Sequence, residues 1–183
     1  MINKSPKETR HPLHMFSYCP VCGSKTFTEI NEKAKQCTAC QFIYYFNPSA
    51  AVACFLRNPE GKLLFVRRAM EPAKGTLDLP GGFIDMHETA EEAINREVKE
   101  ETNLDITEIR YLFTIPNIYP YAGFDVHTVD LFFECIVSDF KSAKAADDAS
   151  GIVILNPEDI RPEDFGLRSI RQGVIQYMSK QQM

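Results

Sequence analysis

The residues best suited to chemistry are three glutamates near the middle of the chain, Glu97, Glu100 and Glu101, and no Lys or Arg follows them before Leu104. On a helix, Glu97 and Glu101 lie one turn apart on the same face, where like charges repel by a few tenths of a kcal/mol. Such an arrangement becomes stable when it binds a cation, and hard carboxylate oxygens favour magnesium, manganese or calcium. The pattern therefore indicates a divalent metal site, and the alternative is an ordinary solvated acidic helix face.

The sequence also predicts the helix that carries these glutamates. Thr89 followed three residues later by Glu92 is a capping box, and Asn103 accepts a left-handed cap, so we expect a helix from Ala90 to Thr102. One stripe of this helix begins apolar and ends acidic, and it comprises Ala90, Ile94, Glu97 and Glu101. Glu92 lies four residues before Arg96, so a surface ion pair between these two is expected.

A glycine-rich turn, Leu79-Pro80-Gly81-Gly82, precedes the helix and allows the backbone to approach a ligand closely. From this turn onward the segment resembles the Nudix box, in which a Gly, five residues, a Glu, seven residues and then Arg-Glu-aliphatic-x-Glu-Glu-x-Gly-aliphatic follow one another. The matching positions are Gly82, Glu88, Arg96, Glu97, Val98, Glu100, Glu101 and Leu104. Asn103 stands where the family has Gly, and Asn also tolerates the positive φ of a helix end.

The resemblance implies an α/β fold with a mixed sheet sandwiched between helices. It also implies a metal-dependent hydrolase that cleaves the diphosphate linkage of a nucleoside diphosphate derivative. The residues that would bind magnesium or manganese are Gly81, through its backbone carbonyl, Glu97, Glu100 and Glu101. Glu88 and Arg96 would hold these glutamates in place, because the orientation of its ligands tunes a metal site.

The general base is left open by the resemblance, and two places in the chain offer candidates. The segment from Thr128 to Val137 alternates, with one apolar face, so Glu134 points either to solvent or into a cleft. Asp147 and Asp148 lie in a loop-like segment where a mobile catalytic loop is plausible. Most acidic loop residues are simply solvated, which is the competing interpretation of this pair.

Four cysteines near the amino terminus form two CxxC pairs, Cys19 with Cys22 and Cys37 with Cys40, separated by fourteen residues. Four thiolates at such spacing favour one tetrahedral structural zinc over disulfides or a redox motif. A segment of about forty residues rarely buries enough surface to fold alone, so we expect zinc to stabilise it.

Length and composition agree with two parts, a zinc ribbon over residues 1–46 and a larger domain over residues 47–183. Asn47-Pro48 is the expected hinge. Strands are expected at Ala50 to Leu56, Leu63 to Arg67, Ile109 to Phe113, Val129 to Val137 and Ile152 to Leu155, and a last helix at Leu167 to Met178.

The net charge and the hydropathy of the chain argue against some classes of binding partner. The formal net charge of −5 argues against broad nucleic-acid binding, for which a basic surface is expected. No apolar run approaches twenty residues, so no membrane span is expected. The polar segment from Met1 to Phe16 does not resemble a secretory leader, and we expect a cytoplasmic protein. A homodimer is implied by the resemblance alone.

The substrate is expected to be a small nucleotide such as ADP-ribose, NADH or a related dinucleotide. The layout of ribbon and box resembles that of NADH pyrophosphatases, but their Ser-Gln-Pro-Trp-Pro-Phe-Pro motif is replaced by the stretch from Thr114 to Tyr121, and the chain has no Trp. The candidate substrate-binding residues are Arg67 and Arg68, for phosphate, and Tyr119 and Tyr121, for stacking on a base. The two tyrosines are expected in a loop that contains Pro and Gly. The alternative function is a nucleotide-sensing module whose ribbon contacts nucleic acid or protein.

Overall fold

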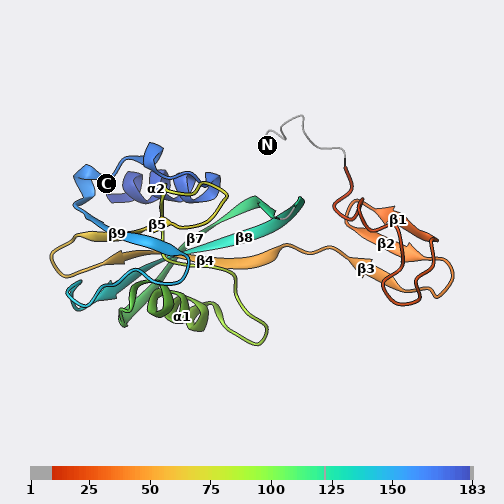
Figure 1. Ribbon diagram of the computed structural model, residues 1–183, viewed down its shortest axis with the longest axis horizontal. Helices are drawn as coiled ribbons and strands as arrows, with labels where there is room; N and C mark the ends of the chain where they lie inside the picture. The colour runs from red at the N-terminus through yellow and green to blue at the C-terminus, as the bar shows by residue number, and fades with distance from the viewer. Residues whose placement is uncertain (1–9, 122, 182–183) are drawn as a thin grey trace. The chain divides into compact units, whose positions relative to one another are not determined.

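The computed structural model describes residues 10–121 and 123–181 (Figure 1). The chain divides into two compact units, and the division falls between Pro48 and Ser49. Each unit has its own sheet, and the two are described separately.

The first unit is a three-stranded antiparallel sheet with a very small core. Its strands are β1 (Phe27–Asn31), β2 (Ala34–Cys37) and β3 (Ile43–Tyr45), in that order across the sheet. The buried hydrophobic cluster consists of Cys19, Phe27 and Cys37, with Phe42 packed against it. So small a core cannot by itself offset the entropy of ordering the segment, which is why the unit needs a cross-link or a metal.

The second unit is built on a mixed sheet with the strand order β6-β5-β4-β8-β7, and β9 pairs with the other side of β5. β4 and β8 run parallel, whereas the other pairs are antiparallel. The bounds are β4 Ser49–Arg57, β5 Leu63–Arg68, β6 Leu77–Asp78, β7 Ile106–Tyr121, β8 Phe124–Val137 and β9 Ala149–Leu155.

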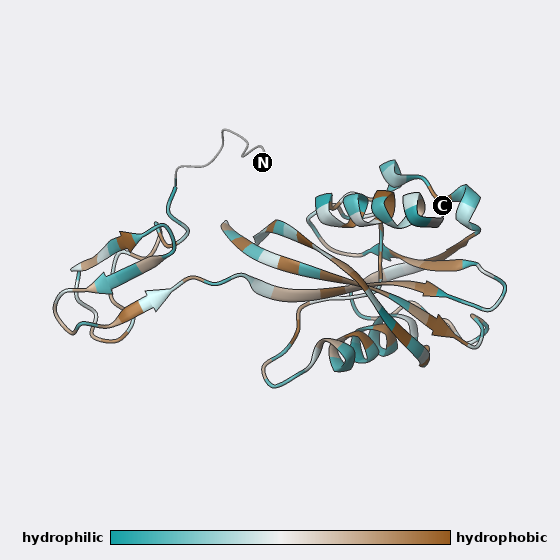
Figure 2. Ribbon diagram, turned by 180° about the vertical axis from the view of Figure 1, so that it is seen from behind, coloured by the Kyte–Doolittle hydropathy of each residue, from teal (hydrophilic) through white to brown (hydrophobic). Residues whose placement is uncertain are grey.

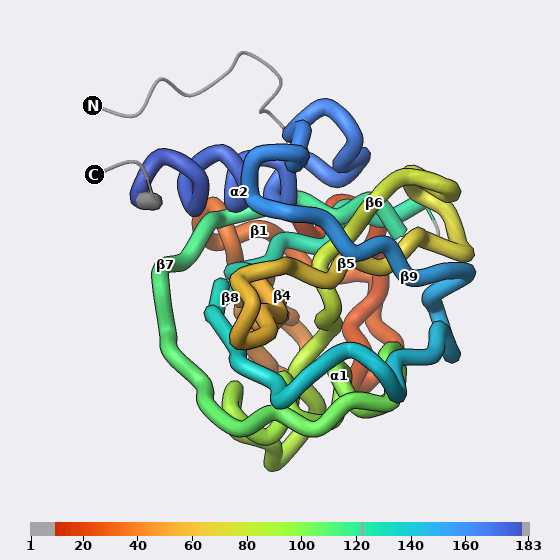
Figure 3. The backbone as a smooth tube through the Cα atoms, turned by 90° about the vertical axis from the view of Figure 1, so that its left-hand side faces the viewer, coloured from red at the N-terminus to blue at the C-terminus, as the bar shows by residue number. Residues whose placement is uncertain are grey.

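Two helices cover opposite faces of this sheet, as Figure 3 shows. One core cluster lies beneath α1 (Ala90–Thr102) and includes Ile94 and Phe133, and the other lies beneath α2 (Arg168–Gln181) and includes Phe132 and Val174. Hydrophobic segments run along the central strands in Figure 2. The expected mixed sheet between helices is therefore confirmed, and two short 3-10 turns, Pro157–Asp159 and Pro162–Asp164, lead into α2.

The alternation expected in β8 holds, but both of its faces are buried from Phe132 to Cys135. Phe133 and Phe132 point to opposite faces and are each almost fully buried, because a helix packs on each side. One apolar face was expected from the alternation, and the second core face was missed.

β7 is much longer than the expected strand from Ile109 to Phe113, and it extends to Tyr121. Pro116 and Pro120 made the second half look like a loop. β7 lies at the edge of the sheet, where a proline can be accommodated because one side of the strand needs no backbone donor. Tyr119 and Tyr121 therefore lie on a strand, and not in a loop as the sequence suggested.

Neither helix among the described residues has the length and apolar character needed to cross a bilayer.

Candidate functional site

Helix α1 begins and ends where the sequence predicted. Thr89 accepts a hydrogen bond from the Glu92 backbone N–H, and the Glu92 side chain accepts one from the Thr89 N–H, which completes the capping box. Asn103 takes the left-handed conformation with φ 59°. These two caps fix which residues face the sheet, and so they fix the direction of Glu97 and Glu101.

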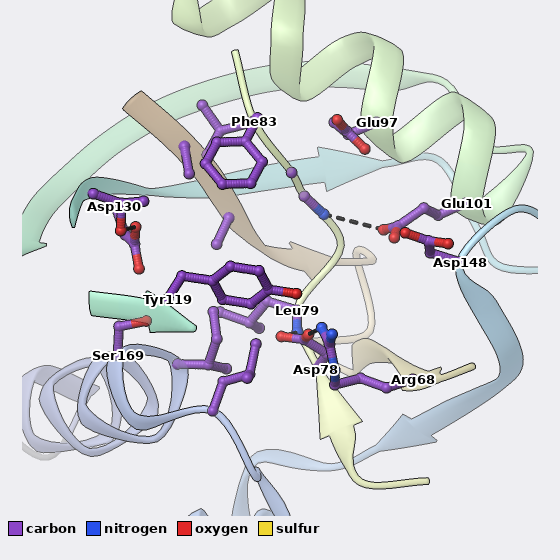
Figure 4. Close-up of a pocket in the computed structure, with 18 of the residues that line it drawn as sticks. Arg68, Asp78, Leu79, Phe83, Glu97, Glu101, Tyr119, Asp130, Asp148 and Ser169 are labelled. Atoms are coloured by element: carbon purple, nitrogen blue, oxygen red, sulfur yellow. Dashed lines mark hydrogen bonds and ion pairs between the residues drawn. The ribbon is translucent and has the colours of Figure 1, made fainter. Parts of the chain in front are cut away.

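The carboxyl end of α1 is also tied to the loop between β8 and β9. The backbone N–H groups of Lys144 and Ala146 donate to the carbonyl oxygens of Thr102 and Glu101, at 2.9 Å and 3.1 Å. These bonds satisfy carbonyl groups that a helix end leaves without partners. They also bring the segment containing Asp148 beside Glu101 (Figure 4).

The glycine turn packs directly against β4. Val52 N–H donates to the Gly82 carbonyl and Cys54 N–H donates to the Pro80 carbonyl, at 2.8 Å and 2.9 Å. A Cβ on Gly81 would overlap the Val52 carbonyl oxygen, and a Cβ on Gly82 would overlap the Glu97 carboxylate. Only glycine allows both approaches, and the Gly81 backbone has a φ of 150° that side chains disfavour.

Arg96 joins the turn to the helix through four partners. It donates to both carboxylate oxygens of Glu88 at 2.8 Å and 2.9 Å, to Glu97 at 2.8 Å, to Glu100 at 3.1 Å and to the Phe83 carbonyl at 3.1 Å. The bonds from Arg96 to Glu88, together with one from the Asp85 N–H, lower the pKa of Glu88 to about 2. The expected surface pair between Glu92 and Arg96 was wrong, because Glu92 is used by the cap and Arg96 turns toward the preceding loop.

Glu101 is an acid at this site whose pKa is strongly raised. Its residue is 6% exposed, and burial raises its pKa to about 9, with Asp78, Glu97 and Asp148 adding repulsion. The Gly81 N–H donates to its carboxylate at 3.1 Å and opposes this effect. Burial also raises the pKa of Glu97, against the influence of Arg96. Buried carboxylates that repel one another in this way suit a divalent cation, which would supply the missing positive charge.

A cavity of about 680 Å³ brings these groups together with an aromatic region. Figure 4 shows Glu97, Glu101 and Asp148 on one side of the backbone segment that carries the Gly81 N–H. Phe83, Tyr119 and Asp130 lie on the other side. The cavity thus has an acidic part and an aromatic part, separated by a stretch of the glycine turn.

Of the residues predicted to bind phosphate or to stack on a base, some line the cavity and one lies on the surface. Tyr119, Tyr121 and Arg68 line the cavity, and Arg68 pairs with the buried Asp78 at 2.5 Å. Arg67 is exposed outside this cavity and donates to the Gly75 carbonyl at 2.6 Å. Arg68 is therefore already neutralised by one carboxylate.

The candidate general bases lie in two different parts of the larger unit. Asp147 and Asp148 are exposed residues that line the cavity. Glu134 lies outside it, buried toward α2, where it accepts hydrogen bonds from Tyr177 at 2.7 Å and Arg110 at 2.6 Å. Sequence reasoning missed Asp78 and Asp130 as cavity residues, since no motif contains them, and the only available signal was an acidic residue within an otherwise apolar strand.

The four amino-terminal cysteines converge as the spacing predicted. Their sulfur atoms all lie within 4.8 Å of one another, with Cys19 to Cys40 at 3.7 Å and Cys22 to Cys37 at 3.6 Å. A tetrahedral zinc with bonds of about 2.3 Å requires sulfurs about 3.8 Å apart, so the donor set fits zinc. The two CxxC turns share one backbone pattern, because the N–H groups of Gly23 and Gln41 donate to the Cys19 and Cys37 carbonyls.

Comparison with known proteins agrees with this architecture. The family model for the NUDIX domain matches residues 47–176, and the model for the NADH pyrophosphatase zinc ribbon domain matches residues 16–45. The first match covers well over half of the chain, so the chain belongs to the Nudix family, in agreement with the resemblance of its box.

Two curated relatives show how far the similarity extends. The NAD-capped RNA hydrolase NudC of Vibrio atlanticus (strain LGP32) is 25% identical over 170 residues, which cover 93% of this chain and 61% of that protein. The NudC protein of Haemophilus influenzae (strain PittGG) is 36% identical over 115 residues, which cover 62% of this chain and 43% of that protein. The chain thus matches less than two thirds of the length of either relative.

Solved structures share the fold. A NUDIX hydrolase from Nitrosomonas europaea aligns with a TM-score of 0.70 and 24% identity over 91% of this chain and 92% of that one. The NUDIX domain of Shewanella oneidensis NrtR, solved with ADP ribose, aligns with a TM-score of 0.59 and 22% identity over 74% of this chain and 89% of that one. At these identities the likeness shows the fold alone.

Proposed function

We propose that this chain hydrolyses the diphosphate linkage of a nucleoside diphosphate derivative such as ADP-ribose, NADH or a related dinucleotide, with magnesium or manganese. The observation that carries the proposal is the buried Glu101 and the half-buried Glu97, which both line a cavity large enough for a nucleotide. The curated relatives named as NAD-capped RNA hydrolases support the dinucleotide class.

Glu97 and Glu101 would hold the divalent ion, together with the Gly81 carbonyl and Glu100. The carbonyls of Pro80 and Gly82 bond to β4, so along this extended segment the intervening Gly81 carbonyl is expected to face away from β4. Magnesium keeps several water ligands, so the carboxylates need not all converge on one point. A bound divalent ion would neutralise phosphate oxygens and make a bound water more acidic.

The other site residues would orient these groups and bind the substrate. Arg96 and Glu88 would fix Glu97 through the hydrogen bonds described above. Asp147 or Asp148 would take a proton from the attacking water, because both line the cavity. Tyr119 and Tyr121 would contact the base, and Arg68, despite its pairing with Asp78, would lie closest to phosphate.

The ribbon would hold one structural zinc through Cys19, Cys22, Cys37 and Cys40. We infer a cytoplasmic protein acting on a small-molecule nucleotide. A sensor that only binds nucleotide has no use for an acidic set that activates water, so retention of Glu97, Glu100 and Glu101 favours turnover.

Turnover of a substrate panel tests the proposal. ADP-ribose, NADH, dinucleoside polyphosphates and nucleoside triphosphates would be incubated with magnesium, and the products identified by mass. Glu97→Gln and Glu101→Gln should each reduce the rate at least about tenfold, because each removes a charged ligand.

Glu91→Gln is the matched control, since Glu91 is exposed on the first turn of the same helix. Near-normal rates in both ligand variants would reject the assignment of these glutamates. Tight binding of a nucleotide with no product would favour the sensor.

A further inference from the structure

Asp130 is a buried acid in the cavity that the proposed hydrolysis leaves without a role. It lies on β8, its residue is 7% exposed, and it lines the cavity in the aromatic part (Figure 4). A buried carboxylate costs free energy unless its oxygens find partners, so its position within a core strand calls for a physical reason.

The protein provides only part of the partners that this carboxylate can take. The Thr128 hydroxyl donates to one oxygen at 2.6 Å, and the Asn117 amide donates to the other at 3.2 Å. Across residues 10–121 and 123–181, no basic side chain forms an ion pair with it within 4.0 Å. A carboxylate offers about four lone-pair sites, so roughly two remain for a donor from the cavity.

Flat aromatic surfaces lie in the same part of the cavity. The Tyr119 ring stands edge-on to Phe83, with centroids 6.1 Å apart at 81°, and lies nearly parallel to Tyr121, with centroids 6.4 Å apart. Small residues, Ala51 and Ala53 of β4, line the cavity nearby. A planar ring could stack here with its edge toward the acceptor.

The glycine turn separates this recognition region from the acidic part, as Figure 4 shows. A substrate with a base at one end and a diphosphate in the middle would span both parts. Asp130 is a hydrogen-bond acceptor in this aromatic part, so it favours a ring that carries a hydrogen-bond donor.

We propose that Asp130 accepts a hydrogen bond from the exocyclic amino group of the substrate's aromatic ring. That group is the amino group of adenine or the carboxamide amino group of nicotinamide, which share this chemistry. Asp130 is then a specificity residue, held in place by Thr128 and Asn117. The inference rests on the proposed function in taking the ligand to be a dinucleotide.

Three dinucleotides separate the two sources of the amino group. NAD carries both groups, nicotinamide hypoxanthine dinucleotide lacks the adenine amine, and nicotinic acid adenine dinucleotide lacks the carboxamide amine. Their affinities would be measured by calorimetry in EDTA, so that no turnover is needed. One of the two analogues should bind at least about tenfold more weakly than NAD, because it leaves a buried acceptor without its donor.

Asp130→Asn tests whether this residue is the origin of the preference. The variant should reduce the difference between NAD and the disfavoured analogue to within about threefold, because the amide can turn its own donor toward the ring. Asp125→Asn, at an exposed position of the same strand outside the cavity, should keep the full difference. Circular dichroism melting would verify that both variants are folded.

The proposal is overturned if both analogues bind within about twofold of NAD, if Asp130→Asn keeps the discrimination, or if no dinucleotide binds at millimolar concentration. The comparison of analogues on the unaltered protein does not depend on any variant folding. Turnover with magnesium, measured in parallel, separates the two proposals. Discrimination between the dinucleotides without turnover would refute the hydrolase and keep the proposed role of Asp130. Turnover without discrimination would keep the hydrolase and refute the role of Asp130.

Discussion

The surroundings of two glutamates in the same motif shift their pKa values in opposite directions. Hydrogen bonds from Arg96 and the Asp85 N–H lower the pKa of Glu88 to about 2, whereas burial raises the pKa of Glu101 to about 9. Glu88 is thus stabilised in its charged form by the protein alone. Glu101 is not, because burial disfavours its charged form. A bound cation would stabilise that charged form.

Replacing Glu101 by Gln should stabilise the metal-free protein at neutral pH. The pKa of Glu101 is higher in the folded than in the unfolded chain, so the folded state loses stability as pH rises from about 4.5 toward 9. In EDTA, Glu101→Gln should raise the free energy of unfolding by on the order of 2 to 4 kcal/mol at pH 7.5 and by little near pH 4.5. Thermal melts across this range measure the difference.

The control for this experiment is again Glu91→Gln, which should shift the melting temperature slightly and equally at all pH values. Added magnesium should stabilise the original protein more than Glu101→Gln, because the variant has lost a charged ligand. A destabilised variant at pH 7.5 in EDTA would show that the buried charge is compensated within the protein.

The spacing of Glu97 and Glu101 places them on one face of a helix, and both line the cavity. Their role as metal ligands stays a prediction. The partners of Arg96 were not predictable in the same way. Its four-residue spacing from Glu92 was a local signal, and a bidentate contact with Glu88 across the turn outweighed it. Asp78 and Asp130 reach the cavity only through strand pairing, which single-residue patterns do not specify.

Helix α1, which carries the glutamates of the site, is defined by strong local signals, which explains why it was predicted well. The capping box and the left-handed Asn103 fix both ends of α1 at the expected residues. β7 was predicted poorly because its prolines signal a turn when read locally, while edge position and pairing with β8 keep the strand extended. The second buried face of β8 depends on α2, which lies far away in the sequence.

The glycine turn gives a prediction at this scale. Gly81→Ala should destabilise the protein by about 2 to 4 kcal/mol, because the new Cβ overlaps the Val52 carbonyl and the backbone conformation disfavours a side chain. Denaturant unfolding would measure the loss.

The matched control is Gly61→Ala in the turn after β4, where φ is 84° and no atom lies within 4 Å of the new Cβ. It should cost only about 1 kcal/mol. Equal effects of the two substitutions would mean that close packing against β4 is not what requires glycine at position 81.

The two units of the molecule are stabilised by different means. The larger unit buries two apolar clusters on either side of one sheet. The described part of the smaller unit buries far fewer hydrophobic residues, namely Leu13, Cys19, Phe27, Ala34 and Cys37, and brings four thiols together. Cysteine spacing and hydrophobic periodicity are separate signals in the sequence, which is why a zinc ribbon over residues 1–46 and a larger domain over residues 47–183 are expected. We therefore expect the smaller unit, and not the larger one, to depend on zinc.

Cys22→Ser should remove the metal from the smaller unit and leave the larger unit folded. Zinc content measured by atomic emission should fall from about one ion per chain to near zero, and the main thermal transition should persist. Cys54→Ala, which alters a buried cysteine of the larger core, should keep the zinc. Full zinc content in Cys22→Ser would contradict the four-cysteine site.

The backbone hydrogen bonds from Lys144 and Ala146 to the end of α1 determine where the loop between β8 and β9 can accept inserted residues. We expect an insertion between Lys141 and Ser142, which are both exposed, to bulge outward without moving Asp148. A single residue added between Ala146 and Asp148 would instead displace that carboxylate from Glu101 while both anchoring bonds remain. The short stretch after Ala146 therefore acts as a spacer of fixed length, and tolerance to insertion should end abruptly there.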